Sequence, residues 1–234
     1  RKFDENGLNY RLERVDFPTG TVQVTLDENK VPSYNIMEGV AWDNIPMTPE
    51  LEALARDCRA VCFGSLAQRS AVSRATINAF IDMMPEDSLK IFDINLRQHY
   101  YTEEIICDSM KKADILKIND EEILVVAQLL DVTEKSEREI CKVLLDKFDL
   151  RMVILTCGDR GSYVLTRDES SWVDTPKVSV VSTVGAGDSF TGTFIASILL
   201  GKTLRQAHEA AVKVSAYVCT CQGAMPAIPK DLLV

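Results

Sequence analysis

The residues best suited to chemistry lie in one short string, S-T-V-G-A-G-D-S-F, over residues 182–190. Its small residues let consecutive backbone N–H groups point into one concavity, and the apolar residues that follow indicate the start of a helix. Clustered N–H groups at the positive end of a helix dipole favour an anion. We therefore expect Gly185, Ala186 and Gly187 to form an anion hole suited to a transferring phosphoryl group.

Asp188 is the candidate catalytic base of this string. It falls in the first turn of the expected helix, where the dipole favours its ionised form. An ionised carboxylate there can accept the proton of an attacking hydroxyl group. The alternative is a glycine-rich turn in which the aspartate only caps the helix. A bare G-x-G-D pattern favours that alternative, whereas the complete string in its context favours the catalytic interpretation.

Two further groups of polar residues follow expected strands. Asn119 and Glu122 stand three positions apart where a helix should begin, so they can share one face of it. A carboxylate there can hold Mg²⁺ through water, as Mg²⁺ usually binds beside phosphates. An acidic cluster that only stabilises the helix start explains these residues equally well. Arg97, at another strand end, can hydrogen-bond a sugar oxygen or form a surface salt bridge.

Gly158 and Gly161 follow an apolar run, M-V-I-L, over residues 152–155. Glycines after a buried strand allow the backbone to approach a flat ligand closely. Taken alone, however, these two glycines favour the alternative, an ordinary hairpin turn between two strands.

The elements that must position these residues alternate along the chain. Strands are expected at residues 60–64, 89–94, 115–118 and 152–155, with shorter ones near 163–165 and 178–181. Helices are expected after the Thr-Pro start at residues 48–49, around 77–84, after Thr102, and near 121–130, 134–148, 188–199 and 203–219. Apolar strands alternating with helices indicate an α/β fold, a mostly parallel sheet with helices on both faces. Ligands of such sheets lie at the carboxyl ends of the strands.

The segment before these elements has a different pattern. Residues 19–36 alternate in polarity, with Val22, Val24 and Leu26 on one face and turn residues at positions 27–30. This pattern predicts an antiparallel hairpin that forms a small separate sheet, such as a lid. We therefore divide the chain into a lid-forming β segment at residues 1–45 and an α/β nucleotide- and sugar-binding domain at residues 46–234.

Composition excludes several functional classes. The 234 residues carry a net charge of −9, and 46% of them are hydrophobic, so a disordered chain and a nucleic-acid-binding protein are both disfavoured. No apolar run approaches the length of a membrane-spanning helix. Seven scattered cysteines indicate a reduced, cytoplasmic chain, and two histidines are too few for a histidine-rich metal site. No P-loop sequence occurs, so that mode of phosphate binding is absent. No G-x-G-x-x-G follows the first parallel strand, which disfavours a dinucleotide-dependent oxidoreductase.

The string at residues 182–190 resembles the signature of the ribokinase, or PfkB-type, carbohydrate kinases. Other segments agree with that family in order and spacing: G-S-L-A-Q-R at 64–69, D-I-N-L-R at 93–97, K-I-N-D-E-E at 117–122 and T-C-G-D-R-G at 156–161. The resemblance covers nearly the whole chain. It is strongest to bacterial fructokinase-like members, through P-T-G-T at 18–21, V-A-W-D at 40–43 and F-D-I-N-L-R at 92–97.

The resemblance implies a ribokinase-like three-layer fold with a small β lid. It implies ATP-dependent phosphorylation of a sugar primary hydroxyl, with fructose as the first choice of acceptor. Other acceptors in the family are 2-keto-3-deoxygluconate, ribose and nucleosides. A sugar- or nucleotide-binding relative without catalysis is the alternative from another class. The resemblance also implies a homodimer that forms through the lid.

Site residues follow from the same resemblance. Asp188 is the base and, with Arg97, contacts the sugar. The implied ATP-binding residues are Asn119, Thr156, Gly158, Gly161 and Gly187. Glu122 and Asn119 are implied to hold Mg²⁺ through water.

The sequence departs from the family pattern at two positions linked to a monovalent cation. Ser182 stands where many members have an aspartate that helps bind the cation, and Ala227 replaces a later hydroxyl residue. Losing an anionic ligand and a neutral oxygen weakens such a site, so we expect little activation by K⁺ over Na⁺.

The opening of the sequence is the last feature that the resemblance addresses. Arg1 begins in what resembles the approach to the lid, and residues 1–16 contain no apolar run. Family members carry before it a β-α-β segment with a Gly-Gly and an Asn that bind the sugar. We therefore expect either that the natural protein extends upstream or that this fragment folds poorly and is inactive.

Overall fold

Six strands form the central sheet of the computed structural model, which describes residues 2–26, 28 and 32–232. Their spatial order equals their sequence order: β3 (Ala60–Phe63), β4 (Leu89–Asp93), β5 (Ile115–Asn119), β6 (Met152–Thr156), β7 (Ser162–Leu165) and β8 (Ser170–Val173). The strands from β3 to β6 are parallel, whereas β7 and β8 join antiparallel. This confirms the expected α/β fold with a mostly parallel sheet.

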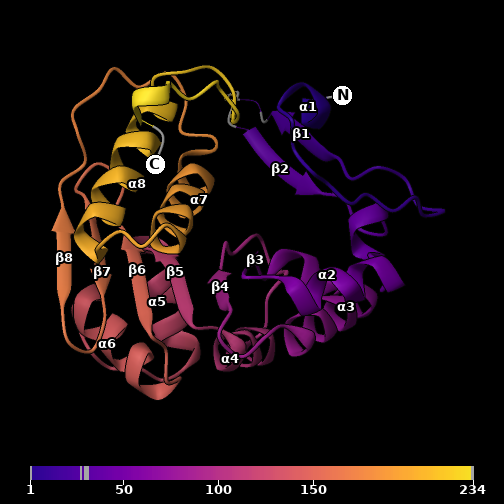
Figure 1. Ribbon diagram of the computed structural model, residues 1–234, viewed down its shortest axis with the longest axis horizontal. Coiled ribbons are helices and arrows are strands. Elements are labelled where there is room, and N and C mark those ends of the chain that lie inside the picture. Colours follow the sequence, from indigo (N-terminus) through magenta and orange to yellow (C-terminus); the bar gives the residue numbers. More distant parts are fainter. Residues whose placement is uncertain (1, 27, 29–31, 233–234) are drawn as a thin grey trace.

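Helices cover both faces of the sheet (Figure 1). Along β5, Leu116 packs into a core with one group of helices and Ile115 into a second core, because alternate side chains of a strand point to opposite faces. The first core is covered by α3 (Ala71–Met83), α4 (Glu103–Lys112), α5 (Asp120–Leu129) and α6 (Glu137–Lys147), beside α2 (Pro49–Asp57). The second core is covered by α7 (Ala186–Leu199) and α8 (Leu204–Cys219). Strands that are apolar throughout are thus buried on both faces.

Helix starts follow the expected capping chemistry. The Thr48 hydroxyl accepts the N–H of Leu51 at 3.2 Å, with a proline at the first helical position of α2. Thr102 caps α4 in the same way, accepting the N–H of Ile105 at 3.2 Å. These side chains satisfy backbone donors that have no partner within the helix. None of the helices in the described parts of the chain is long and apolar enough to cross a membrane.

The strand predicted at residues 178–181 is wrong. No strand forms there; instead, the N–H groups of Val181 and Ser182 both donate to the carbonyl oxygen of Cys219, at 2.8 and 3.2 Å. The valines of this segment favour a strand, but their backbone bonds to the carboxyl end of α8 and not to a neighbouring strand. The last strand of the sheet is β8, which has the sequence S-S-W-V and lies at a sheet edge, where an apolar run is not required.

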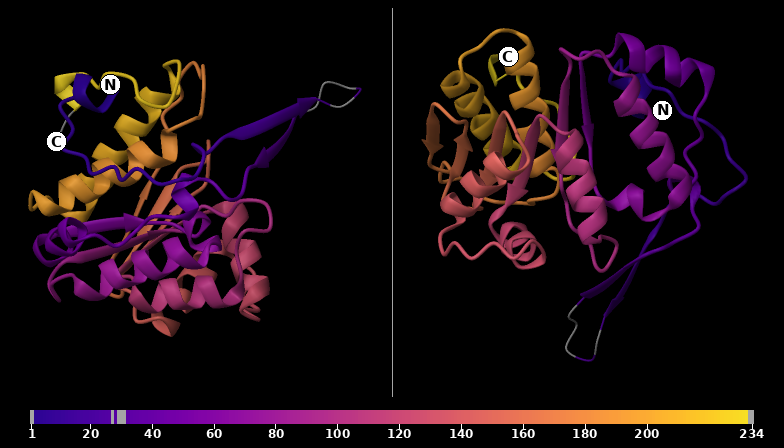
Figure 2. Two further views of the ribbon diagram at one scale, coloured as in Figure 1. Left: turned by 90° about the vertical axis from the view of Figure 1, so that its right-hand side faces the viewer. Right: turned by 90° about the horizontal axis from the view of Figure 1, so that it is seen from below.

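The N-terminal hairpin forms the small separate sheet that the alternating pattern predicts. Strand β1 (Val22–Leu26) pairs antiparallel with β2 (Pro32–Ile36), and the hairpin projects from the body of the molecule in both views of Figure 2. Val24 lies opposite Tyr34 in the register, and both side chains are exposed. Apart from Glu28, the turn expected at residues 27–30 lies outside the described residues. A short helix, α1 (Lys2–Glu5), precedes the hairpin.

A buried ion pair anchors the base of the hairpin. The guanidinium group of Arg69 meets both carboxylate oxygens of Asp43, at 2.8 and 2.9 Å, and also donates to the carbonyl oxygens of Ile36 and Met37 at the end of β2. The side chains of Arg69 and Asp43 are 6% and 5% exposed. Trp42 lies against the same guanidinium group, 4.2 Å from the ring centre. Arg69 therefore joins the hairpin to the larger domain through buried polar contacts.

Candidate active site

A cavity of about 930 Å³ opens at the carboxyl ends of the central strands, beside the first turn of α7. Most of the predicted site residues line it: Arg97, Asn119, Thr156, Gly158, Gly161, Gly185, Ala186, Gly187 and Asp188. Glu122 is the one predicted site residue that does not line the cavity. The fold thus brings together motifs that lie far apart in the sequence, as expected for ligands of parallel sheets.

The Gly-Ala-Gly turn has the geometry of a helix start. Gly185 is the N-cap of α7 with φ of +86°, a conformation that favours glycine. A Cβ atom added to Gly185 would lie 2.4 Å from the carbonyl oxygen of Ala224, so a close backbone approach also excludes a side chain. The Ala186 N–H donates to the carbonyl oxygen of Thr183 at 3.2 Å, whereas the N–H groups of Gly185 and Gly187 have no acceptor among the described residues. These two N–H groups are therefore the ones available to an anion in the cavity.

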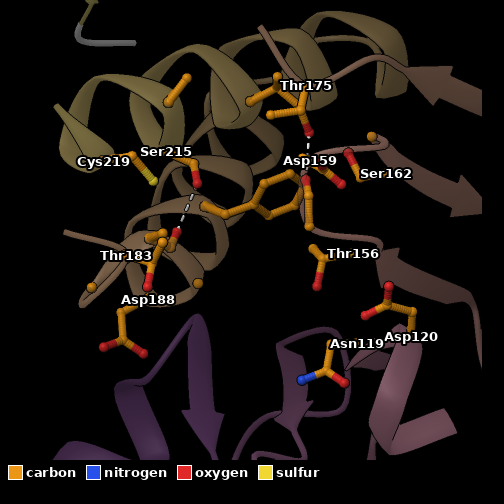
Figure 3. A pocket seen from close by; sticks show the side chains of 18 of the residues that line it. Asn119, Asp120, Thr156, Asp159, Ser162, Thr175, Thr183, Asp188, Ser215 and Cys219 are labelled. Carbon is orange, nitrogen blue, oxygen red and sulfur yellow. Dashed lines mark hydrogen bonds between the residues drawn. The ribbon is translucent and has the colours of Figure 1, made fainter. Parts of the chain in front are cut away.

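Asp188 lies in the first turn of α7, and its carboxylate is exposed to the cavity. Among the described residues it has no hydrogen-bond or ion-pair partner. Figure 3 shows Asp188 and Asn119 projecting toward the lower end of the cavity from opposite sides. A carboxylate without a partner, next to N–H groups that favour an anion, can accept a proton from a bound hydroxyl.

Asn119 and Glu122 form a capping box at the start of α5. The Asn119 side-chain oxygen accepts the N–H of Glu122 at 2.7 Å, and the Glu122 carboxylate accepts the N–H of Asn119 at 3.1 Å. The second oxygen of Glu122 accepts the N–H of Leu96 at 2.9 Å. This buried carboxylate therefore ties the start of α5 to the loop that carries Arg97.

The same contacts bear on the predicted Mg²⁺ site. Both oxygens of Glu122 already accept backbone N–H groups, so they do not fit direct coordination of a metal. No cluster of three metal-ligating side chains occurs in the described residues. Glu121, which lines the cavity, is better placed for a contact through water. A Mg²⁺ ion held mainly by nucleotide phosphates fits this donor set, and the role of Glu122 as a metal contact stays a prediction.

The turn after β6 forms the opposite wall of the cavity. Gly161 has φ of +145°, and an added Cβ would lie 2.6 Å from the carbonyl oxygen of Val173, so glycine is required here for folding as well as for ligand approach. The Thr175 hydroxyl donates to the carbonyl oxygen of Gly158 at 2.7 Å (Figure 3). Arg160 pairs with Asp120 at 3.0 Å and holds this turn against α5.

Several cavity residues were missed in the sequence. Ser162 begins β7, and its hydroxyl meets Nε2 of His208 at 2.7 Å, while Nδ1 of His208 meets the Ser171 hydroxyl at 2.9 Å. Burial lowers the pKa of His208 to about 4, so the ring is neutral at physiological pH.

Lys117 and Asp93 also line the cavity. A signal for these two was present, since charged residues stand near the carboxyl ends of apolar strands.

A three-layer α/β fold whose cavity places a glycine-rich helix start beside the Asp188 carboxylate is the arrangement expected of a phosphoryl-transfer enzyme. The family model of the pfkB family carbohydrate kinases matches residues 1–231, so the chain belongs to this family. Membership confirms the resemblance in the sequence motifs and identifies an ATP-dependent sugar kinase.

Individual relatives agree with this assignment. The chain is 28% identical to an ATP-dependent 6-phosphofructokinase of Thermoanaerobacterium thermosaccharolyticum over 236 residues, which are 98% of this chain and 71% of the relative. It is 25% identical to probable fructokinase-2 of Arabidopsis thaliana, over 97% of this chain and 71% of that protein. An uncharacterized sugar kinase of Pyrococcus horikoshii, solved in complex with ATP, superposes with a TM-score of 0.77 at 25% identity, covering 95% of this chain and 72% of its own.

Proposed function

We propose that this kinase transfers the γ-phosphoryl group of ATP to a primary hydroxyl of fructose. The observation that carries the proposal is the Asp188 carboxylate, which lies beside the Gly-Ala-Gly turn and has no partner within the described part of the chain. The similarity to fructokinases supports the choice of sugar. Arg97 lines the same cavity and is the candidate contact to the sugar.

The proposed reaction follows from this arrangement. The sugar hydroxyl gives its proton to Asp188 while its oxygen forms a bond to the γ-phosphorus. The bond from that phosphorus to the bridging oxygen breaks, and ADP leaves. The N–H groups of Gly185 and Gly187, which have no acceptor among the described residues, hydrogen-bond the phosphoryl oxygens as charge develops on them. Mg²⁺ bound with the nucleotide neutralises phosphate charge.

An anionic acceptor is a second candidate. Among the described residues Arg97 donates only to the carbonyl oxygen of its neighbour Leu96, so its guanidinium group is free to bind a phosphate or carboxylate. One relative is a 6-phosphofructokinase. Fructose 6-phosphate and 2-keto-3-deoxygluconate therefore belong in the comparison, with ribose and a nucleoside.

The test is ADP release by the full-length protein with this panel of acceptors. Fructose is expected to give the highest kcat/KM. A higher kcat/KM with fructose 6-phosphate, lost selectively in Arg97→Ala, would favour the anionic acceptor instead. ATP binding without ADP release for any acceptor would identify a non-catalytic relative.

Activation by monovalent cations is a separate expectation. The Ser182 hydroxyl accepts the N–H of Val184 at 3.2 Å, so it is engaged in a local turn, and Ala227 has no side-chain oxygen. We expect little difference between kcat in K⁺ and kcat in Na⁺ at equal ionic strength. Ser182→Asp, which restores the family's carboxylate, is the matched gain-of-function variant. Strong K⁺ stimulation of the unchanged protein would contradict the expectation and point to backbone carbonyls as sufficient ligands.

We also propose a homodimer formed through the hairpin. Val22, Val24 and Tyr34 expose 53%, 54% and 59% of their surface on one face of a two-stranded sheet, and such a sheet needs cover to be stable. Light scattering at micromolar concentration is expected to give the mass of a dimer. Val24→Lys should produce a monomer, whereas Thr25→Lys on the opposite face should not. A monomeric unchanged protein would refute this assembly.

A further inference from the structure

Lys117 is a buried charge within an otherwise apolar part of the sheet. It lies on β5 between Leu116 and Ile118, which are fully buried, and is itself only 8% exposed. Its direct neighbour in the register of β4 is Asp93, and the Lys117 ammonium lies 3.1 Å from an Asp93 carboxylate oxygen. Both residues line the active-site cavity.

Stability does not explain this pair. Removing two charges from water costs as much as or more than their attraction returns, so apolar residues of similar size often stabilise such positions more. Apolar side chains would fit at positions 93 and 117, because Ile91 and Ile115, on the same face of β4 and β5, pack in the core beneath α7. A buried lysine is therefore a sign of a functional requirement.

The Lys117 ammonium group has N–H donors that no described residue accepts. Apart from its ion pair with Asp93, the Lys117 ammonium has no hydrogen-bond partner among the described residues, and the Asp93 oxygen that it faces has none either. The other Asp93 oxygen accepts the Thr191 hydroxyl of α7 at 2.9 Å. Asp93 is thus fixed to α7 and holds the ammonium by charge, leaving its N–H donors available to a ligand.

The position of the ammonium identifies that ligand. A Cβ atom added to Gly187 would lie 3.3 Å from Lys117 Nζ. The charge therefore lies directly beside the anion hole, and the absent side chain of Gly187 keeps the path between them open. A compact positive charge at the start of α7 is suited to phosphate oxygens.

We propose that Lys117 is a catalytic residue whose ammonium hydrogen-bonds an oxygen of the transferring phosphoryl group, and that Asp93 is the positioning residue that holds it. Lys117 takes no part in the proton transfer, since Asp188 accepts the proton of the acceptor hydroxyl. Its charge stabilises the negative charge on the phosphoryl oxygens in the transition state. The inference rests on the proposed anion hole but not on the identity of the sugar.

Lys117→Met tests the proposal, because methionine keeps much of the apolar stem and removes the charge. We expect kcat/KM to fall by about 10²–10³-fold, the usual cost of losing one donor to a transition-state oxyanion. Affinity for ATP, measured by calorimetry on the full chain, should fall more than affinity for AMP, which lacks the γ-phosphate. Lys90→Met, on the neighbouring strand and outside the cavity, is the matched control and should leave both unchanged.

The double variant Lys117→Met with Asp93→Asn separates catalysis from structure. If Lys117 only balances Asp93, removing both charges should restore activity toward that of Asp93→Asn alone. If Lys117 contacts the phosphoryl group, the double variant stays as inactive as Lys117→Met, and it supplies the test should the single variant not fold. Restored activity, or equal losses of affinity for ATP and AMP, would overturn the proposal. Asp188→Asn distinguishes failure of the Lys117 proposal from failure of the proposed function. An inactive Asp188→Asn variant together with a fully active Lys117→Met variant would overturn the role of Lys117 and leave the proposed function intact.

Discussion

Asp188→Asn is expected to lower kcat by about 10²–10⁴-fold, the contribution of a positioned general base. The asparagine amide cannot accept the proton of the acceptor hydroxyl, yet it is nearly isosteric with the carboxylate. Because Asp188 has no protein partner among the described residues, its loss should not disturb folding. Initial rates of ADP release, with the thermal unfolding midpoint measured in parallel, provide the test.

ATP affinity is the internal control for this variant. The Gly-Ala-Gly turn and the turn after β6 remain intact, so calorimetric titration with ATP should give nearly unchanged affinity. Asp168→Asn, a surface substitution outside the cavity, controls for loss of negative charge. Near-normal turnover in Asp188→Asn would exclude this residue as the base.

Arg69→Met is expected to lower the free energy of unfolding by about 3–5 kcal/mol, the cost of leaving a buried charge without its partner. Asp43 is only 4% exposed, and the variant also loses the contacts to the rings of Trp42 and Tyr100. Urea denaturation at neutral pH measures the change. Arg74→Met is the control, because Arg74 pairs with the exposed carboxylates of Glu104 and Asp108, and such pairs contribute less than about 1 kcal/mol.

The pH dependence identifies Asp43 as the cause. Burial alone would raise the pKa of Asp43, but hydrogen bonds from Arg69 and the Val40 N–H, with the charge of Arg69, outweigh it and lower the pKa. A carboxyl group with a lowered pKa adds stability above its unfolded pKa of about 4, which is lost as the pH falls through the folded value. The difference between the unchanged protein and Arg69→Met should therefore be largest at neutral pH and shrink in acid. A difference that does not change with pH would contradict this account.

The sequence alone was sufficient to predict the elements whose causes are local. The proposed anion hole consists of consecutive residues at a helix start, so Gly185, Ala186, Gly187 and Asp188 could be placed together without knowing their surroundings. Apolar runs and capping residues such as Thr48 likewise act within a few positions. The α/β class followed from their alternation.

Only the tertiary structure decided features that depend on partners distant in the chain. The strand predicted at residues 178–181 does not form because the Val181 N–H finds its acceptor at Cys219, at the end of α8. Glu122 accepts the N–H of Leu96, which no local pattern of the sequence reveals. Lys117 meets Asp93 through the register of two parallel strands, and the packing of α7 on the sheet brings its ammonium beside Gly187. Backbone propensity and capping are properties of neighbouring residues, whereas these pairings arise only when the sheet and α7 pack, and for that reason the sequence by itself could not specify them.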